Sequence, residues 1–168
     1  MAELKKISPE ELNDNVFKLI GSDWMLITAG KIGAYNTMTA SWGAMGVLWS
    51  KKVCFCFIRP DRHTRSFVEK SDKFTLSFFN DDYRGALNLC GSRSGRDTDK
   101  AKEAGITPVK SPSGSVYFGE ARLVIECKKI YFQDFDPANF VDAGIQGNYP
   151  KNDYHRMYVG EIIGCYIK

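Results

Sequence analysis

The feature that most constrains this chain is a series of short, strand-like segments separated by turn signals. They cover residues 24–29, 35–42, 53–58, 73–79, 115–119, 120–133 and 155–167. Aromatic residues make up 13% of the chain, a high content that favours pleated structure. Six or more strands with short helices between them predict a mainly β fold, a barrel with helical decoration.

Short helices are expected between these strands. At the N-terminus, Ser8 caps a helix, Pro9 suits its first position and Glu11 completes a capping box. This N-terminal helix is expected to cover about residues 9–20. Further helices are expected at 64–70, 83–89, 99–104 and 136–141, with a polar loop at 90–97.

Length, charge and cysteine content limit the classes of protein that fit. A chain of 168 residues predicts a single domain over 1–168, with its barrel at about 23–167. The net charge of +3 is too small to indicate nucleic-acid binding. The longest uncharged stretch, 32–50, has too many polar residues and glycines to span a membrane. Five cysteines without a CxxC spacing predict buried thiols in a reducing compartment, so we expect a cytoplasmic protein without a signal peptide.

One strand-like segment has an unusual composition. Residues 36–43 are Asn-Thr-Met-Thr-Ala-Ser-Trp-Gly, so Thr37, Thr39 and Ser41 share one face of an extended strand. Small polar residues would let a ligand approach the backbone, whose N–H and C=O groups would then contact the edge of that ligand. The alternative is a half-exposed strand with no ligand.

Arginine residues gather directly after a buried strand-like run. Arg59, Arg62 and Thr64 could converge on one phosphate group through charge-assisted and hydroxyl hydrogen bonds. Arg93 and Arg96 form a second small basic cluster. Clusters of this size suit a phosphate better than a nucleic-acid duplex, and the alternative is a solvated loop.

The sequence motifs of several enzyme classes are absent. The chain contains no GxGxxG, GxxxxGK[ST], HExxH or GxSxG sequence. Because it has two histidines, we expect no His-rich metal site. These absences argue against a Rossmann site, a P-loop, a zinc protease and a serine hydrolase.

The two unusual segments resemble the flavin reductase-like family. Residues 36–42 and 59–64 are similar to the flavoredoxin and ferric-reductase group of FMN-binding split barrels. Residues 74–80, 91–96 and 158–162 follow in the order of that family, so the resemblance covers about 23–167. It implies a six-stranded antiparallel split β-barrel that binds FMN non-covalently, near the interface of a homodimer.

The resemblance also implies which residues contact the cofactor. The first segment would face the isoalloxazine, the arginine segment would lie near the ribityl phosphate, and the loop at 92–95 would cover part of FMN. Trp42 or Phe79 would contact the dimethylbenzene end, and His155 and Tyr158 would approach the flavin. The implied set is Asn36, Thr37, Met38, Thr39, Ala40, Ser41, Trp42, Arg59, Pro60, Arg62, His63, Thr64, Phe79, Ser92, Ser94, Gly95, His155 and Tyr158. No catalytic side chain and no metal is expected, because the flavin carries the redox chemistry.

The function implied is that of an FMN-dependent oxidoreductase. NADH or NADPH would transfer hydride to FMN, and electrons would pass to free flavin, ferric iron or a partner protein. Since no second nucleotide motif is visible, the nicotinamide would stack on the exposed flavin face. One alternative is a flavin-binding electron carrier without NAD(P)H turnover of its own. Another is a nucleic-acid-binding barrel, against which the small net charge argues; we expect neither a nucleic-acid nor a membrane partner.

Overall fold

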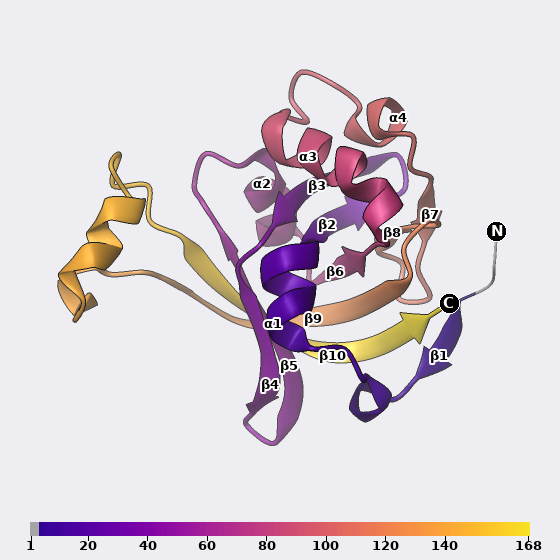
Figure 1. Cartoon of the computed structure of the whole chain (residues 1–168), viewed down its shortest axis with the longest axis horizontal. Coiled ribbons are helices and arrows are strands. Elements are labelled where there is room, and N and C mark those ends of the chain that lie inside the picture. Colours follow the sequence, from indigo (N-terminus) through magenta and orange to yellow (C-terminus); the bar gives the residue numbers. More distant parts are fainter. Residues whose placement is uncertain (1–3) are drawn as a thin grey trace.

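A large antiparallel sheet, curled into a barrel, dominates the computed structural model, which describes residues 4–168 (Figure 1). Its strands follow the order β3-β2-β6-β9-β10-β5-β4, and β1 pairs with β10. The mainly β, antiparallel class predicted from the sequence is confirmed. The strands are β1 (Lys5–Ile7), β2 (Met25–Lys31), β3 (Ala34–Ala40), β4 (Gly43–Leu48), β5 (Lys51–Ile58), β6 (Lys73–Phe78), β9 (Leu123–Asp134) and β10 (Arg156–Ile167), with β7 (Pro108–Lys110) and β8 (Val116–Phe118) in a separate two-stranded sheet.

The main sheet contains eight strands, two more than the resemblance implies. One addition is the three-residue strand β1. The other is β4, because the strand predicted at 35–42 ends at Ala40 and a new strand begins at Gly43. β4 forms a hairpin with β5 through Trp49 and Ser50, which have φ angles of 52° and 57°. Two central residues with positive φ are the hairpin geometry for which Gly and Asn are the usual signal, so this turn was not visible in the sequence.

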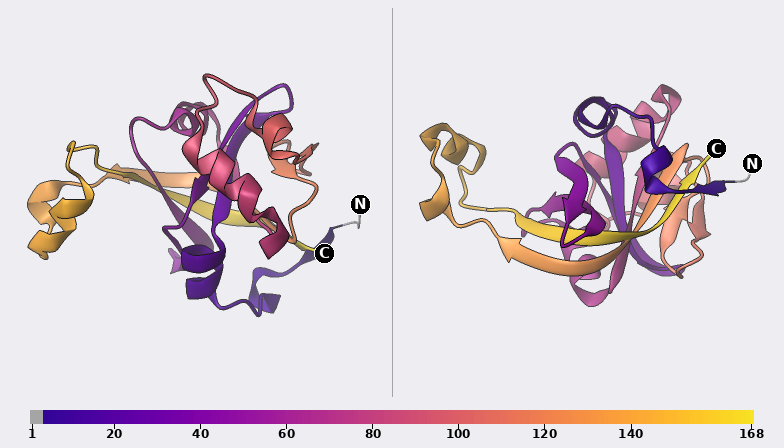
Figure 2. Two further views of the ribbon diagram at one scale, coloured as in Figure 1. Left: turned by 45° about the horizontal axis from the view of Figure 1, so that its top comes forward. Right: turned by 90° about the horizontal axis from the view of Figure 1, so that it is seen from below.

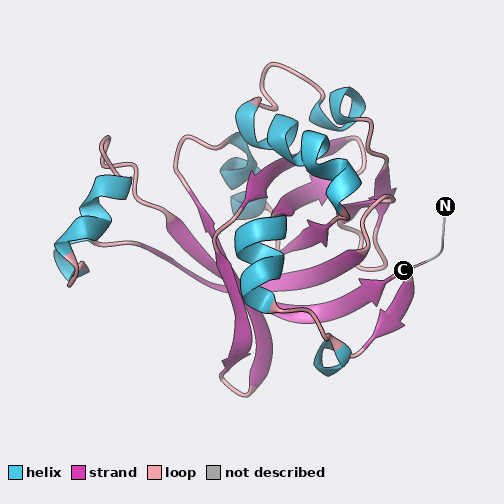
Figure 3. Cartoon of the chain, viewed as in Figure 1, coloured by secondary structure: helices cyan, strands magenta, loops and turns pink. Residues whose placement is uncertain are grey.

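Helices surround the barrel (Figure 3). The predicted helices at 64–70, 83–89 and 99–104 are present as α2, α3 and α4, while the one predicted at 136–141 is a short 3₁₀ turn, η4. The α-helices are α1 (Val16–Lys18), α2 (His63–Lys70), α3 (Arg84–Ser92) and α4 (Lys100–Ala104). The 3₁₀ turns are η1 (Pro9–Glu11), η3 (Asp81–Tyr83), η4 (Pro137–Asn139) and η5 (Ala143–Asn148), and η2 (Leu19–Asp23) is a π-helix. No helix within residues 4–168 has the length and apolar character needed to cross a membrane.

The prediction of one N-terminal helix over 9–20 is wrong. η1 begins as expected, and the Ser8 N–H donates to the Glu11 carboxylate at 2.6 Å. The chain then leaves the helix at Leu12, whose backbone is extended. A second start follows at Asn15, whose side chain accepts hydrogen bonds from the N–H groups of the first turn of α1. A polar side chain that bonds to the backbone competes with helix continuation, and here it divides the segment.

The barrel core is apolar and includes most of the cysteine side chains. All five cysteines are buried free thiols, as predicted. A second apolar cluster lies between the sheet and α3 and contains Leu26, Leu87 and Phe118. α3 packs against β3 through this cluster, and α2 packs against β2 and β3. These two helices therefore place their ends beside the β3 edge of the sheet.

The connection between β9 and β10 forms an arm that projects from the barrel (Figures 1 and 2). It comprises residues 135–155 and carries η4 and η5 at its far end. At its base, Arg156 of β10 pairs with Asp134 of β9 and with Ile58, the last residue of β5. The base of the arm therefore lies beside the end of β5.

Candidate functional site

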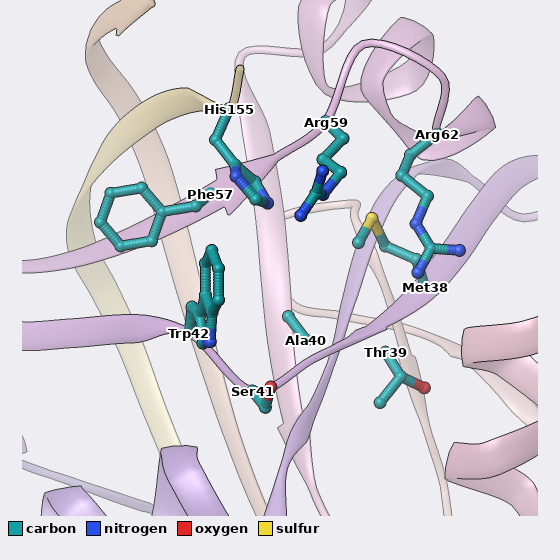
Figure 4. A pocket seen from close by; sticks show the side chains of 9 residues that line it. All are labelled: Met38, Thr39, Ala40, Ser41, Trp42, Phe57, Arg59, Arg62 and His155. Atoms are coloured by element: carbon teal, nitrogen blue, oxygen red, sulfur yellow. The ribbon is translucent and has the colours of Figure 1, made fainter. Parts of the chain in front are cut away.

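The candidate site lies at the seam of the barrel. β3 and β4 stand at the two ends of the strand order and are joined by Ser41 and Trp42, and within residues 4–168 they do not pair with each other. A cavity of about 170 Å³ opens at this link; we call it the seam cavity (Figure 4). Edge strands present unpaired N–H and C=O groups, so a ligand there can meet peptide groups as well as side chains. Its lining residues are Met38, Thr39, Ala40, Ser41, Trp42, Phe57, Arg59, Arg62 and His155.

A second cavity of about 150 Å³ adjoins the first and shares Met38 and Arg62 with it. We call it the basic cavity, because four cationic side chains and one carboxylate line it. α2 begins in its wall, and the Arg62 side chain does not cap that helix. A helix N-terminus favours an anion, so charge and backbone together suit a phosphate. Its lining residues are Met38, Asp61, Arg62, His63, Thr64, Ser92, Arg93, Ser94, Arg96 and Lys100.

An apolar groove of about 840 Å³ lies on the other side of the Ser41–Trp42 link. It shares Ser41, Trp42 and Phe57 with the seam cavity. The Phe17 side chain in its wall is 90% exposed. The remaining lining residues are Val16, Ile20, Gly21, Gly43, Ala44, Met45 and Phe135. The three hollows therefore adjoin one another through shared lining residues, and their chemistry changes from cationic through polar to apolar.

The sequence predicts that the hydroxyl groups of β3 face a ligand, but in the structure the hydroxyls of Thr37 and Thr39 bond to protein groups. Thr37 Oγ1 lies 2.8 Å from Thr28 Oγ1 on the neighbouring strand, and both residues are buried. Thr39 Oγ1 donates to the Leu87 carbonyl of α3. α3 covers this face of β3, so the hydroxyls satisfy buried groups there. Thr39 and Ser41 still line the seam cavity, where the strand ends.

Asn36 holds the loop after α3 beside α2. Its Nδ2 donates to Thr64 Oγ1 at 2.8 Å, and Asn36 is buried. Gly95 packs so closely that a Cβ atom at this position would lie 1.8 Å from Asn36 Oδ1. Asn36 and Gly95 therefore shape the basic cavity from behind rather than line it.

Lys100 was not predicted, and it is a buried cation of the basic cavity. Its Nζ donates to the Thr37 carbonyl at 2.8 Å and to the Cys90 carbonyl at 2.9 Å. Burial lowers the pKa of the Lys100 ammonium to about 8. The Asp99 cap at the start of α4 was visible in the sequence, but the burial of the next residue was not. Lys100 ties the loop after α3 to β3.

Arg59 and Arg62 do not converge on one point. Arg59 Nη1 donates to Asp153 Oδ2 at 2.7 Å and its Nη2 to the Asn148 carbonyl at 2.9 Å, so it is bonded to the arm. Arg62 Nη1 donates to the Gly91 carbonyl at 2.7 Å and reaches both cavities. Figure 4 shows the two guanidinium groups apart. Arg59 therefore has a carboxylate partner on the arm, and its predicted contact with a phosphate shared with Arg62 stays a prediction.

Three residues of the predicted set lie away from both cavities. Pro60 is exposed in the turn before α2. Phe79 is buried in the cluster beneath α3, beside Phe118, so it cannot contact the dimethylbenzene end of a ligand in the seam. Tyr158 is buried in the barrel core, where its hydroxyl donates to Glu69 Oε1 at 3.3 Å. Tyr158 therefore belongs to the barrel core, and Phe79, which follows β6, belongs to the cluster between the sheet and α3.

Other residues of the site were missed by the prediction. Phe57 lines the seam cavity and the apolar groove; its alternation with the buried Cys56 and Ile58 was the available signal. Arg93 and Arg96 line the basic cavity, and their clustering in the sequence did suggest a phosphate. Arg96 Nη1 donates to the Asp61 carbonyl at 3.2 Å, which brings the loop after α3 to the start of α2.

Comparisons with known proteins agree with this architecture. The sequence pattern of the family described as "Flavin reductase like domain" matches residues 17–168, so the chain belongs to this family, as its resemblance implied. No curated protein matches the sequence. The solved structures that resemble this chain share less than 25% of its sequence, so their likeness establishes the fold.

Three solved structures illustrate that fold. An FMN-binding domain of a flavin reductases-like enzyme from Shewanella baltica OS155 has a TM-score of 0.71 at 18% identity, over 98% of this chain and 77% of that one. A flavoredoxin from Methanosarcina acetivorans has a TM-score of 0.70 at 19% identity, over 99% and 76%. An NADH:FAD oxidoreductase from Streptomyces globisporus C-1027 has a TM-score of 0.67 at 15% identity, over 87% and 75%.

Proposed function

We propose that this chain binds FMN across the three hollows and acts as an oxidoreductase. The observation that carries this proposal is their order: a cationic cavity, a polar seam and an apolar groove lie next to one another and share lining residues. FMN has the same order of chemistry, from its phosphate through the polar edge of the isoalloxazine to the dimethylbenzene ring. The solved relatives described as FMN-binding support the same ligand.

The residues present fit this cofactor. Ser92, Ser94, Arg93 and Arg96 would hold the phosphate together with the start of α2. The end of β3 would hydrogen-bond the polar edge of the ring, and Trp42 and Phe57 would contact its apolar end. The close packing of Gly95 on Asn36 leaves the loop near enough to β3 to close over the phosphate. The protein would thus bind and orient the cofactor and exclude water from it.

Bound FMN would supply the redox chemistry, accepting a hydride from NADH or NADPH and passing electrons to free flavin, ferric iron or a partner protein. The exposed side of the seam cavity would admit the nicotinamide, since no separate dinucleotide motif is present. The NADH:FAD oxidoreductase among the similar structures supports a nicotinamide nucleotide as the electron donor.

Two measurements test the proposal. FMN fluorescence should be quenched on titration with the protein, with a roughly micromolar or lower Kd. Absence of binding to FMN and FAD at high protein concentration would overturn the proposal. The FMN-loaded protein should then oxidise NADH or NADPH in a stopped-flow assay, and bound FMN that neither nucleotide reduces would favour an electron carrier instead.

We also propose that the chain is a homodimer in which a second copy covers the apolar groove. The groove is large and open, and Phe17 and Trp42 in its walls are 90% and 44% exposed. Aromatic residues are enriched at interfaces, and a two-fold dimer is the commonest closed assembly. A second copy would bury these rings and complete the wall around the apolar end of the flavin.

A further inference from the structure

A group of four side chains joins the arm to the seam cavity. Arg59 stands at the end of β5, and Tyr149, Asp153 and His155 belong to the arm. The Arg59 guanidinium bonds Asp153 and lies 5.1 Å above the centre of the Tyr149 ring. The Tyr149 hydroxyl lies 2.8 Å from Nδ1 of His155. These contacts hold the imidazole of His155 at the wall of the cavity.

The hydrogen bond between Tyr149 and His155 has a preferred direction. Tyr149 is 2% exposed, and within residues 4–168 its hydroxyl bonds to no atom other than His155 Nδ1. Burial raises the pKa of the Tyr149 hydroxyl, so the hydroxyl keeps its proton. A buried hydroxyl proton without an acceptor is costly, so the hydroxyl donates to Nδ1. A neutral imidazole whose Nδ1 accepts must carry its proton on Nε2.

Nε2 of His155 is available to a ligand. The imidazole points into the seam cavity between Trp42 and Arg59 (Figure 4). Its ring lies 5.1 Å from the Trp42 ring. In the part of the chain that the structure describes, no protein group forms a hydrogen bond with Nε2.

We propose that Tyr149 is a positioning residue that holds His155 as the Nε2–H tautomer, so that the imidazole donates a hydrogen bond to a carbonyl oxygen of the ring system bound in the seam cavity. This role rests on the proposed function, because the ring is that of the flavin or of a nicotinamide stacked on it. Arg59 and Asp153 do not contact Nδ1 of His155; they hold the segment of the arm that carries Tyr149.

Burial, more than the surrounding charges, keeps the imidazole of His155 neutral. Burial lowers the pKa of His155 to about 4; the positive charges of Arg59 and Arg62 act in the same direction, and the carboxylates of Asp153 and Asp61 oppose them. A further titratable neighbour is the Tyr149 hydroxyl, which can donate to Nδ1 only while Nδ1 is unprotonated. His155 is therefore a hydrogen-bond donor that stays uncharged near neutral pH.

NMR of the ¹⁵N-labelled full chain without ligand tests the tautomer. The chain has two histidines, so His63→Gln assigns the imidazole signals of His155. The wild type should show a protonated Nε2, an unprotonated Nδ1 and no titration between pH 5 and 8. In Tyr149→Phe the Nε2–H preference should fall, and the proton affinity of His155 should rise about tenfold.

Tyr154→Phe is the matched control, because this tyrosine lies on the same arm but bonds Gln146 and Asn152 rather than His155. It should leave the His155 signals unchanged. A wild-type His155 that carries its proton on Nδ1, or that titrates near pH 6.5, would overturn the proposal.

Ligand titration tests the donor role. His155→Leu should weaken FMN binding or raise the KM for the nicotinamide nucleotide about tenfold, and His155→Gln should restore most of that loss because its amide N–H also donates. Equal effects of Leu and Gln would exclude donation by His155. If FMN does not bind the wild type at all, the proposed function fails, while the NMR measurement still decides the tautomer.

Discussion

Arg93 and Arg96 are the side chains on which recognition of a phosphate would depend. Both lie in the loop after α3 and line the basic cavity, whereas Arg59 is bonded to the arm. Arg96 is anchored by the Asp61 carbonyl, and no hydrogen bond restrains the Arg93 side chain within the described chain. Of the two basic clusters in the sequence, Arg93 and Arg96 thus line a ligand cavity, whereas Arg59 forms an internal contact with the arm.

Replacing Arg93 with Gln should weaken FMN binding by about 1.5–3 kcal/mol, because a charge-assisted hydrogen bond to the phosphate is lost. Riboflavin has no phosphate, so its affinity should hardly change. Fluorescence titration with both flavins measures the difference, and Lys31→Gln at the far end of β2 is the control. An equal loss for FMN and riboflavin would show that the phosphate lies elsewhere.

Lys100 gives the second prediction at this scale. In Lys100→Met the carbonyls of Thr37 and Cys90 lose their shared donor, and each buried acceptor left unsatisfied costs about 1–3 kcal/mol of folding stability. The folded pKa of about 8 lies below the unfolded value near 10.5, so between them the unfolded state binds more protons and stability rises with pH. Denaturant unfolding at pH 8 and 9.5 should show wild type gaining about 1–2 kcal/mol relative to the variant. A constant difference between them would mean that burial does not lower the pKa of Lys100 and that the side chain stays charged in both the folded and the unfolded state.

At the scale of elements, the arm between β9 and β10 has few anchors. It projects from the barrel (Figure 2). The Arg59–Asp153 pair joins it to the end of β5. Asp153 carries this contact on one oxygen, while its Oδ1 is buried without a hydrogen-bond partner in the described chain. The position of the arm determines where His155 lies in the wall of the seam cavity. The Arg59–Asp153 contact therefore helps to shape the site.

Asp153→Asn should loosen the arm without unfolding the barrel. Hydrogen exchange should speed up over residues 135–155 and stay unchanged in β9 and β10, because local opening needs less free energy than global unfolding. Glu161→Gln removes the exposed Lys51–Glu161 pair between β5 and β10 and serves as the matched control. If hydrogen exchange over residues 135–155 became equally fast in Glu161→Gln and Asp153→Asn, Asp153 would have no specific role in anchoring the arm.

At the scale of the whole molecule, the proposed dimer and the flavin would stabilise each other. If each FMN touched both copies, ligand binding would strengthen association by linkage. Phe17→Asp should therefore shift sedimentation towards monomer and lower FMN affinity, since it places a charge in the apolar groove. Ile32→Asp, at an exposed apolar position in the β2–β3 turn, is the control. A wild-type monomer at tens of micromolar with and without FMN would contradict the shared-site arrangement.

The sequence by itself determined the features that depend on neighbouring residues. Alternation of side chains, caps and turn residues predicted the antiparallel β class, most of the long strands and helices α2, α3 and α4. The hydroxyl-rich and arginine-rich segments, with the family resemblance that they carry, pointed to residues 36–42 and 59–64, of which 38–42, 59 and 62–64 line the two cavities. Such signals act within a few positions of the chain, so one sequence is enough to recognise them.

Only the tertiary structure decided which partner each side chain found. Arg59 bonds Asp153, 94 positions away, and Lys100 bonds the Thr37 carbonyl, 63 positions away, so neither contact leaves a local pattern. Phe79 and Tyr158 are aromatic residues of a kind that often lines pockets, yet Phe79 is buried beneath α3 and Tyr158 in the barrel core. Which face of a strand meets a ligand is set when distant strands close the barrel, because the alternation of a strand defines two faces but does not say what covers each.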